Sequence, residues 1–212
     1  MKTMMNILAG AAMLLLPLFA AADVTPPDVL VKTTANDVLA IIKSDKDIQA
    51  GDMSKITALA EAKILPQFDF NRMSRMVLGK YWAGATPDQQ HQFIAQFRSL
   101  LIRTYASALS KYRDQTIEYK PLRADAGATD VTVKTQINQP SGQPIPIDYS
   151  LIKNPDGWKV YDVVIDGISL VTNYRGQFAE IARQGGLDQV IQRLADKNKQ
   201  QSTVAAADGK KS

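Results

Sequence analysis

The chain has 212 residues, of which 45% are hydrophobic, a formal net charge of +4 and no cysteine. It is long enough to form a domain with a buried core, and without cysteine it has no disulfide framework, zinc–thiolate site, iron–sulfur cluster or cysteine nucleophile. Its basic and acidic residues are interspersed, which argues against nucleic-acid binding.

The first 22 residues have the pattern of a secretory signal peptide. A short basic start precedes an apolar stretch over residues 7–19, and small residues precede an expected cleavage site after Ala22. A single membrane anchor is the alternative, but Gly10 and Pro17 interrupt the apolar run, which falls short of the roughly 20 residues that a span needs. Export together with the absence of cysteine predicts a location in a bacterial periplasm.

Apolar residues at helical spacing predict four helices in the first half of the mature chain, over residues 28–45, 52–66, 69–79 and 86–112. Asp28 and Asp69 are the expected N-caps of the first and third, Gly51-Asp52 is the expected start of the second, and Pro66 is expected to end it. Thr86 and Gln89 form a capping box before the fourth, whose large rings make it the central packing helix.

From Thr116 the apolar period changes from 3.6 to 2, which predicts a passage from helices to strands. Four antiparallel strands are expected in succession, at residues 116–119, 131–137, 145–151 and 158–165. The last is apolar on both sides and is therefore expected to lie in the centre of the sheet.

The helical period then returns for two further helices. The first runs from Ile168 to a glycine pair at Gly185-Gly186, and the second from Asp188 to about Asn198. Residues 200–212 have no periodicity and are expected to be a disordered tail. Residues 23–199 are thus predicted to form a single domain.

The sequence offers little catalytic chemistry. His91 is the only histidine and is expected on a solvated helix face, and no nucleophile elbow, nucleotide-binding glycine motif or calcium loop occurs. Asp162 and Asp166 share a strand face about 13 Å apart, too far for a glycosidase pair. The sequence therefore predicts no enzyme, no metal site and no cofactor.

Apolar and aromatic residues are in surplus on both the helices and the sheet. These residues form either an ordinary core or the lining of a pocket, and sequence periodicity does not separate the two.

Two blocks of sequence resemble the motifs of the MlaC family. The first comprises Val77-Leu78-Gly79-Lys80-Tyr81-Trp82, Ala85-Thr86-Pro87-Asp88-Gln89 and residues 93–98. The second comprises Trp158-Lys159-Val160-Tyr161-Asp162-Val163, Asp166-Gly167-Ile168-Ser169-Leu170-Val171 and Tyr174-Arg175. Their order and spacing agree with the family, and the resemblance covers roughly residues 30–194.

This resemblance implies an α+β fold in which helices wrap around a curved four-stranded antiparallel sheet, a cone similar to nuclear transport factor 2 with an internal apolar cavity. It also implies a periplasmic phospholipid carrier, linked to organic-solvent tolerance, whose cavity holds the acyl chains and leaves the headgroup near solvent. The expected lining residues are Val77, Tyr81, Trp82, Phe97, Leu101, Tyr105, Ile147, Tyr149, Leu151, Tyr161, Val163, Leu170 and Tyr174.

The same resemblance implies partners at both membranes. They are an outer-membrane lipoprotein–porin complex and an inner-membrane MCE-domain protein of an ABC transporter, between which a monomeric carrier would move lipid and maintain outer-membrane lipid asymmetry. Lys80, Arg98 and Arg175 are expected to be solvated charges, with phosphate contact as the alternative. Two other classes stay open: an enzyme on the same fold, which would need a buried polar dyad, and a periplasmic adaptor without a cavity.

Overall fold

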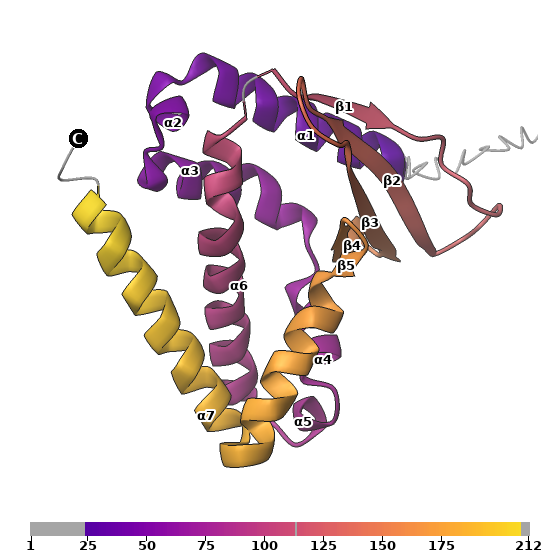
Figure 1. The fold of residues 1–212 in the computed structure, drawn as a ribbon. Coiled ribbons are helices and arrows are strands. Elements are labelled where there is room, and N and C mark those ends of the chain that lie inside the picture. The colour runs from indigo at the N-terminus through magenta and orange to yellow at the C-terminus, as the bar shows by residue number, and fades with distance from the viewer. Residues whose placement is uncertain (1–23, 113, 209–212) are drawn as a thin grey trace, which may run out of the picture.

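The computed structural model describes residues 24–112 and 114–208. The expected signal peptide, with its cleavage site, lies outside the described residues. The chain forms an α+β fold, in which three N-terminal helices lie beside a five-stranded antiparallel sheet at one end, α4 and α5 (residues 70–83) lie at the other, and α6 (Pro87–Ser110) and α7 (Leu170–Asp208) run between the two ends (Figure 1).

The N-terminal helices are α1 (Pro27–Ser44), α2 (Lys46–Ala50) and α3 (Met53–Leu59). The expectation that Asp28 caps α1 is wrong: the helix begins at Pro27, whose missing N–H costs nothing in the first turn, and Asp28 lies inside that turn. Helix α2 was not predicted. Asp45 caps it by accepting hydrogen bonds from the backbone N–H groups of Asp47 and Ile48.

Asp69 caps α4 (Phe70–Leu78), as the sequence predicts, and Asp52, at the expected start of the second helix, caps α3. The α-helical geometry of α3 ends at Leu59, and Pro66 lies later, in a 3-10 turn, η2 (Leu65–Gln67), which follows a π-helical turn, η1 (Ala60–Ile64). Gly79 separates α4 from a short helix that was not predicted, α5 (Lys80–Ala83).

The long helix α6 (Pro87–Ser110) begins at the predicted capping box. The backbone N–H of Gln89 donates to the Thr86 hydroxyl at 3.2 Å, and the Gln89 side chain accepts from the Thr86 N–H at 3.0 Å. Phe93, Phe97 and Leu100 are almost completely buried. Helix α6 is therefore the central packing helix, as expected.

The sheet consists of β1 (Thr116–Tyr119), β2 (Asp130–Asn138), β3 (Ile145–Asn154), β4 (Gly157–Ile165) and β5 (Ile168–Ser169), in that order and all antiparallel. The four predicted strands are confirmed. The centre of the sheet is β3 rather than β4. Helices α4 and α7 contact β4, and Phe68 and β5 both pair with its outer edge. Strand β4 is therefore covered without being central, which explains its apolar sequence.

Strand β5 was predicted to be the start of a helix. Asp166 and Gly167 both have positive φ, 50° and 79°, which suits a tight two-residue hairpin turn, and Ile168 pairs with Ile165 before the helix begins. Ile168 is 61% exposed, since it lies at the edge of the sheet.

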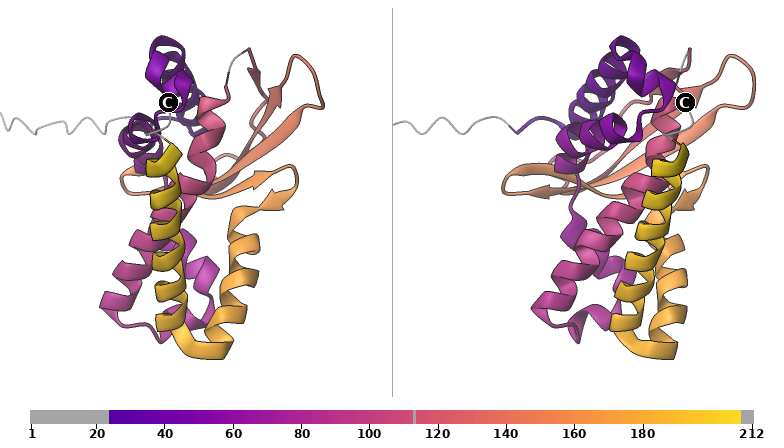
Figure 2. Two further views of the ribbon diagram at one scale, coloured as in Figure 1. Left: turned by 60° about the vertical axis from the view of Figure 1, so that its left-hand side comes forward. Right: turned by 90° about the vertical axis from the view of Figure 1, so that its left-hand side faces the viewer.

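Helix α7 (Leu170–Asp208) contains the two predicted C-terminal helices, joined through non-helical backbone at Gly185 and Gly186. Figure 2 shows its first half descending from the sheet and its second half returning alongside α6. The helix continues through residues 200–208, where no regular structure was expected; Ala205 to Ala207 are strong helix formers. Across residues 24–112 and 114–208, no helix combines the length and apolar character of a membrane span.

Candidate functional site

The face of the sheet that turns toward the helices is apolar, and its register is set by cross-strand pairing. Val133, Tyr149 and Val163 are paired across β2, β3 and β4, and Thr135, Ile147 and Ile165 form the next row. Tyr119 of β1 extends that second row. The polar groups on this face are hydroxyls, which can find hydrogen-bond partners nearby. The Thr135 hydroxyl, for example, donates to the backbone carbonyl of Ile147 at 2.9 Å.

The helices bring an aromatic cluster to the same core. Phe97 lies at its centre, with ring centroids 5.3 Å from Tyr174 and 5.9 Å from Phe178 in edge-to-face geometry, and 5.6 Å from Phe93. Edge-to-face ring pairs add about 0.5–1.5 kcal/mol each beyond their area burial. This cluster joins α6 firmly to the first half of α7.

All thirteen residues expected to line a cavity belong to one apolar cluster. Eight of them are buried, namely Val77, Trp82, Phe97, Leu101, Leu151, Val163, Leu170 and Tyr174, and five are half-buried, namely Tyr81, Tyr105, Ile147, Tyr149 and Tyr161. The structure thus brings together residues from four helices and two strands. Their role as a lipid lining stays a prediction, because a packed core has the same composition.

Tyr161 is held differently from the others. The pairing of β3 with β4 shifts between Ser150 and Leu151, so Val160 lies opposite Leu151 and Tyr161 has no partner in the register. The Tyr161 hydroxyl donates to the Asp130 carboxylate at 2.9 Å, and the guanidinium of Arg72 lies 4.6 Å from the ring centroid. Tyr161 therefore belongs to a polar contact between α4 and the sheet as well as to the apolar cluster.

Several half-buried tyrosines, among them Tyr105, Tyr119 and Tyr149, have phenols whose ionisation is opposed by their surroundings. Burial raises the pKa of Tyr149 to about 12 and that of Tyr105 to about 12, the latter with a hydrogen bond to Tyr174. Burial also raises the pKa of Tyr119. These phenols stay neutral at physiological pH, so they add hydrogen-bonding capacity to the apolar faces without adding charge.

Several residues of this face were not among the predicted lining residues. Thr135, Val131 and Val133 are buried on β2, and Val160 replaces Tyr161 in the row of Leu151. The alternating pattern of β2 already marked its valines as inward-facing. The β4 bulge had no such signal, because strict alternation places Tyr161 and Val163 on one face.

Two surface hollows have none of the thirteen residues in their lining. The larger, about 940 Å³, lies between the loop after β1 and the start of β2, and its lining includes Lys120, Arg123, Asp125, Asp130 and Lys134. The smaller, about 350 Å³, lies between α1 and η1. Neither corresponds to the cavity expected between helices and sheet, which stays a prediction.

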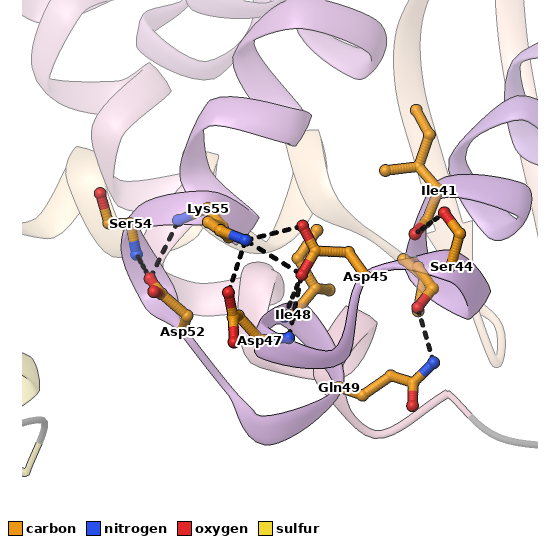
Figure 3. Close-up of polar contacts among 10 residues, drawn as sticks. Ile41, Ser44, Asp45, Asp47, Ile48, Gln49, Asp52, Ser54 and Lys55 are labelled. Atoms are coloured by element: carbon orange, nitrogen blue, oxygen red, sulfur yellow. Dashed lines mark hydrogen bonds and ion pairs between the residues drawn. The ribbon is translucent and has the colours of Figure 1, made fainter.

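The densest polar cluster joins the N-terminal helices. The ammonium of Lys55 lies 3.0 Å from a carboxylate oxygen of Asp45 and 2.6 Å from one of Asp47 (Figure 3). These hydrogen bonds raise the pKa of Lys55 and lower the pKa of Asp45. Asp45 also caps α2, and the cluster is open to solvent. We therefore interpret the cluster as a structural link between α2 and α3 rather than a binding site.

Other candidate residues take structural or surface positions. Asp162 accepts hydrogen bonds from the Val171 N–H and the Ser169 hydroxyl at the start of α7. His91 is exposed, as expected. Lys80 and Arg175 are also exposed, and the Arg98 guanidinium lies 6.0 Å from the ring centroid of Phe70. Among the described residues, no three side chains of His, Cys, Asp or Glu are grouped closely enough to hold a metal ion.

Comparison with known proteins gives consistent matches over most of the chain. The family model described as MlaC protein matches residues 32–196. The toluene tolerance protein ttg2D of Pseudomonas putida is 30% identical over 189 residues, covering 87% of each chain. The intermembrane phospholipid transport system binding protein MlaC of Haemophilus influenzae is 25% identical over 173 residues, covering 80% of this chain and 81% of its own.

Among solved structures, the phospholipid-binding protein of Ralstonia solanacearum, determined in complex with a phospholipid, superposes with a TM-score of 0.80. It is 44% identical and covers 84% of this chain and 99% of its own.

Proposed function

Because this chain belongs to the MlaC family, we propose that it is a periplasmic phospholipid carrier in intermembrane phospholipid transport. Members of the family are non-enzymatic lipid carriers. The main support for phospholipid as the cargo is the complex of the Ralstonia solanacearum protein, which shares 44% of its sequence with this chain.

One observation in this chain carries the proposal: the sheet face that turns toward the helices has no formal charge in its central rows. Those rows are Thr135, Ile147 and Ile165; Val133, Tyr149 and Val163; and Val131, Leu151 and Val160. On the helical side the same apolar cluster includes Phe97, Leu101, Tyr105 and Tyr174. Acyl chains between these two faces would meet apolar side chains and neutral phenols.

The energetics explain why such a carrier is needed. At about 0.8 kcal/mol per methylene, exposing two acyl chains with about 28 methylenes to water costs roughly 20 kcal/mol. Transfer from a bilayer into an equally apolar pocket is close to neutral, so loading and release depend on docking at partners. No covalent bond is made or broken in this mechanism.

The finer features of the function follow the same proposal. Residues 1–22 act as a signal peptide cleaved after Ala22, and residues 23–199 form the lipid-binding domain. The mature monomer takes lipid between an outer-membrane lipoprotein–porin complex and an inner-membrane MCE-domain protein of an ABC transporter. The thirteen predicted residues line the space that the acyl chains fill.

Mass spectrometry of an organic extract from the purified protein tests the function. We expect phospholipid at about one molecule or more per protein chain, and none in an extract of an unrelated periplasmic protein purified in the same way. Protein that is folded but carries no phospholipid, and that takes up none from vesicles, would favour the alternative of an adaptor without a cavity.

A further inference from the structure

The two sequence blocks that resemble the family motifs meet at Gly79. This glycine lies between α4 and α5 with φ of 54° and ψ of −122°, and the Arg175 guanidinium of α7 lies 3.6 Å from where a Cβ on Gly79 would be. The Arg175 fork therefore lies beside the α4–α5 turn.

Three exposed cations surround this turn. They are Arg75, whose backbone carbonyl accepts from the Gly79 N–H, Lys80, which follows Gly79, and Arg175. Neither residues 70–87 nor residues 167–179 contain an acidic residue. Within residues 24–112 and 114–208, no ion pair links any of the three to a carboxylate. We define Arg75, Lys80 and Arg175 as the basic patch.

The patch continues toward a half-exposed tyrosine. The Lys80 ammonium lies 5.3 Å from the ring centroid of Tyr81. The nearby acid Glu180 is already paired with Arg183 at 2.7 Å. Arginine and tyrosine are enriched at protein–protein interfaces, where they act as anchors.

We propose that the basic patch is the docking site for a protein partner that presents a carboxylate-rich surface. The guanidinium of an arginine can offer two parallel N–H donors to one carboxylate, which favours a protein acid over diffuse charge. The exposed large apolar residues of the described chain are Val24, Val29 and Ile168, and none belongs to the patch. Three charges by themselves give only a weak contact with a membrane.

The cations also lie near the C-terminus of α4, where positive charge stabilises a helix. If the cations only stabilise α4, removing them should lower the thermal stability of the protein and leave partner binding unchanged. The experiment must measure both quantities.

This inference rests on the proposed function, since the partner to be tested is one that exchanges lipid. The probe is the purified soluble part of the MCE-domain protein from the same bacterium. Its affinity is measured for the wild-type protein, for K80Q/R175Q, and for the control R193Q/K197Q, which removes two exposed charges from the second half of α7. Thermal unfolding and co-purified phospholipid are measured for all three.

The proposal predicts that K80Q/R175Q binds about tenfold more weakly or worse, and that rising salt weakens wild-type binding. The control should bind as the wild type does, and unfolding temperature and bound lipid should not change. The proposal is overturned if K80Q/R175Q binds the probe as tightly as the wild type does. It is also overturned if the control loses as much affinity as K80Q/R175Q, or if the wild-type protein does not bind the probe.

Vesicles of phosphatidylglycerol and phosphatidylethanolamine form a second arm. Patch-dependent capture on these vesicles, without binding to the protein probe, would assign the patch to an anionic lipid surface and overturn the proposal. The lipid content of the wild-type protein is judged separately: protein without phospholipid contradicts the carrier function even if docking depends on the patch.

Discussion

The carboxylate of Asp162, in β4, accepts a hydrogen bond of 3.0 Å from the backbone N–H of Val171, in the first turn of α7. Its other oxygen accepts from the Ser169 hydroxyl at 2.6 Å, and Ser169 in turn accepts from the Thr172 N–H. A carboxylate at a helix N-terminus is favoured by both the free N–H groups and the helix dipole. Asp162 therefore fixes the point at which the first half of α7 leaves the sheet.

Replacing Asp162 with alanine should lower the free energy of unfolding by about 1–2 kcal/mol, because the Val171 N–H and the Ser169 hydroxyl lose their acceptor. D162N, which keeps an acceptor oxygen, should recover part of the loss. Urea denaturation measures both variants. D125A in the exposed loop after β1 is the matched control and should be near neutral; equal stability of D162A and D125A would contradict the capping role.

Replacing Gly79 with alanine should cost about 1–3 kcal/mol, since its φ of 54° and ψ of −122° suit glycine alone. The added Cβ would lie 3.6 Å from the Arg175 guanidinium, an ordinary van der Waals distance, so the expected cost comes from the backbone conformation. Gly84 is the natural control, because it has an ordinary φ of −92° and nothing within 4 Å of an added Cβ. G84A should be neutral or slightly stabilising in the same denaturation experiment, and a G79A variant as stable as G84A would show the turn to be unstrained.

Stability should fall in alkaline solution. Tyr105 and Tyr149 ionise at a pKa of about 12 in the folded protein against 10.0 for an ordinary tyrosine. Between these values the unfolded state has lost protons that the folded state keeps, so the free energy of unfolding decreases as pH rises from about 10 to 12. Below pH 10 both states hold the protons and the contribution is constant.

Ultraviolet titration of tyrosinate checks this directly. We expect late-ionising phenols in the wild-type protein and a smaller late fraction in Y105F and Y149F. A titration curve of Y149F that matches the wild type would contradict the assignment to that residue.

Charge placed on the predicted lining should remove lipid. Y105E and V163D put a carboxylate among apolar side chains, and because a charge is costly to desolvate, co-purified phospholipid should fall below detection by mass spectrometry. The controls are T104E on the exposed face of α6 and V164D, whose side chain alternates to the other face of β4.

Both controls should retain lipid, and circular dichroism should show that each compared pair is folded. Y105E is the safer test of the two, because Tyr105 is half-buried whereas Val163 is 6% exposed. Wild-type lipid content in a folded Y105E protein would contradict its place in the lining.

Much of the local structure could be predicted from short-range patterns. The capping box of Thr86 and Gln89, the caps Asp52 and Asp69, and the alternation of β2 depend on residues within four positions of one another. These patterns can be recognised in the sequence, because helix capping and strand pleating are determined by neighbouring residues. The same is true of the glycine pair that divides α7.

The composition of the candidate site was also visible in the sequence, but its arrangement was not. The bulge that leaves Tyr161 unpaired, its contacts with Asp130 and Arg72, and the meeting of Gly79 with Arg175 join residues far apart in the chain. The central place of β3 likewise depends on what covers the edge of β4.

The sequence by itself therefore determined the family, the passage from helices to four strands and back to helices, and the apolar residues that gather in one cluster. Only the tertiary structure decided which residues share a sheet row, which carboxylate holds α7 and where the exposed cations come together. The physical reason is that apolar burial is non-directional and depends on residue type, whereas register, hydrogen bonds and charge contacts depend on the relative positions of distant segments.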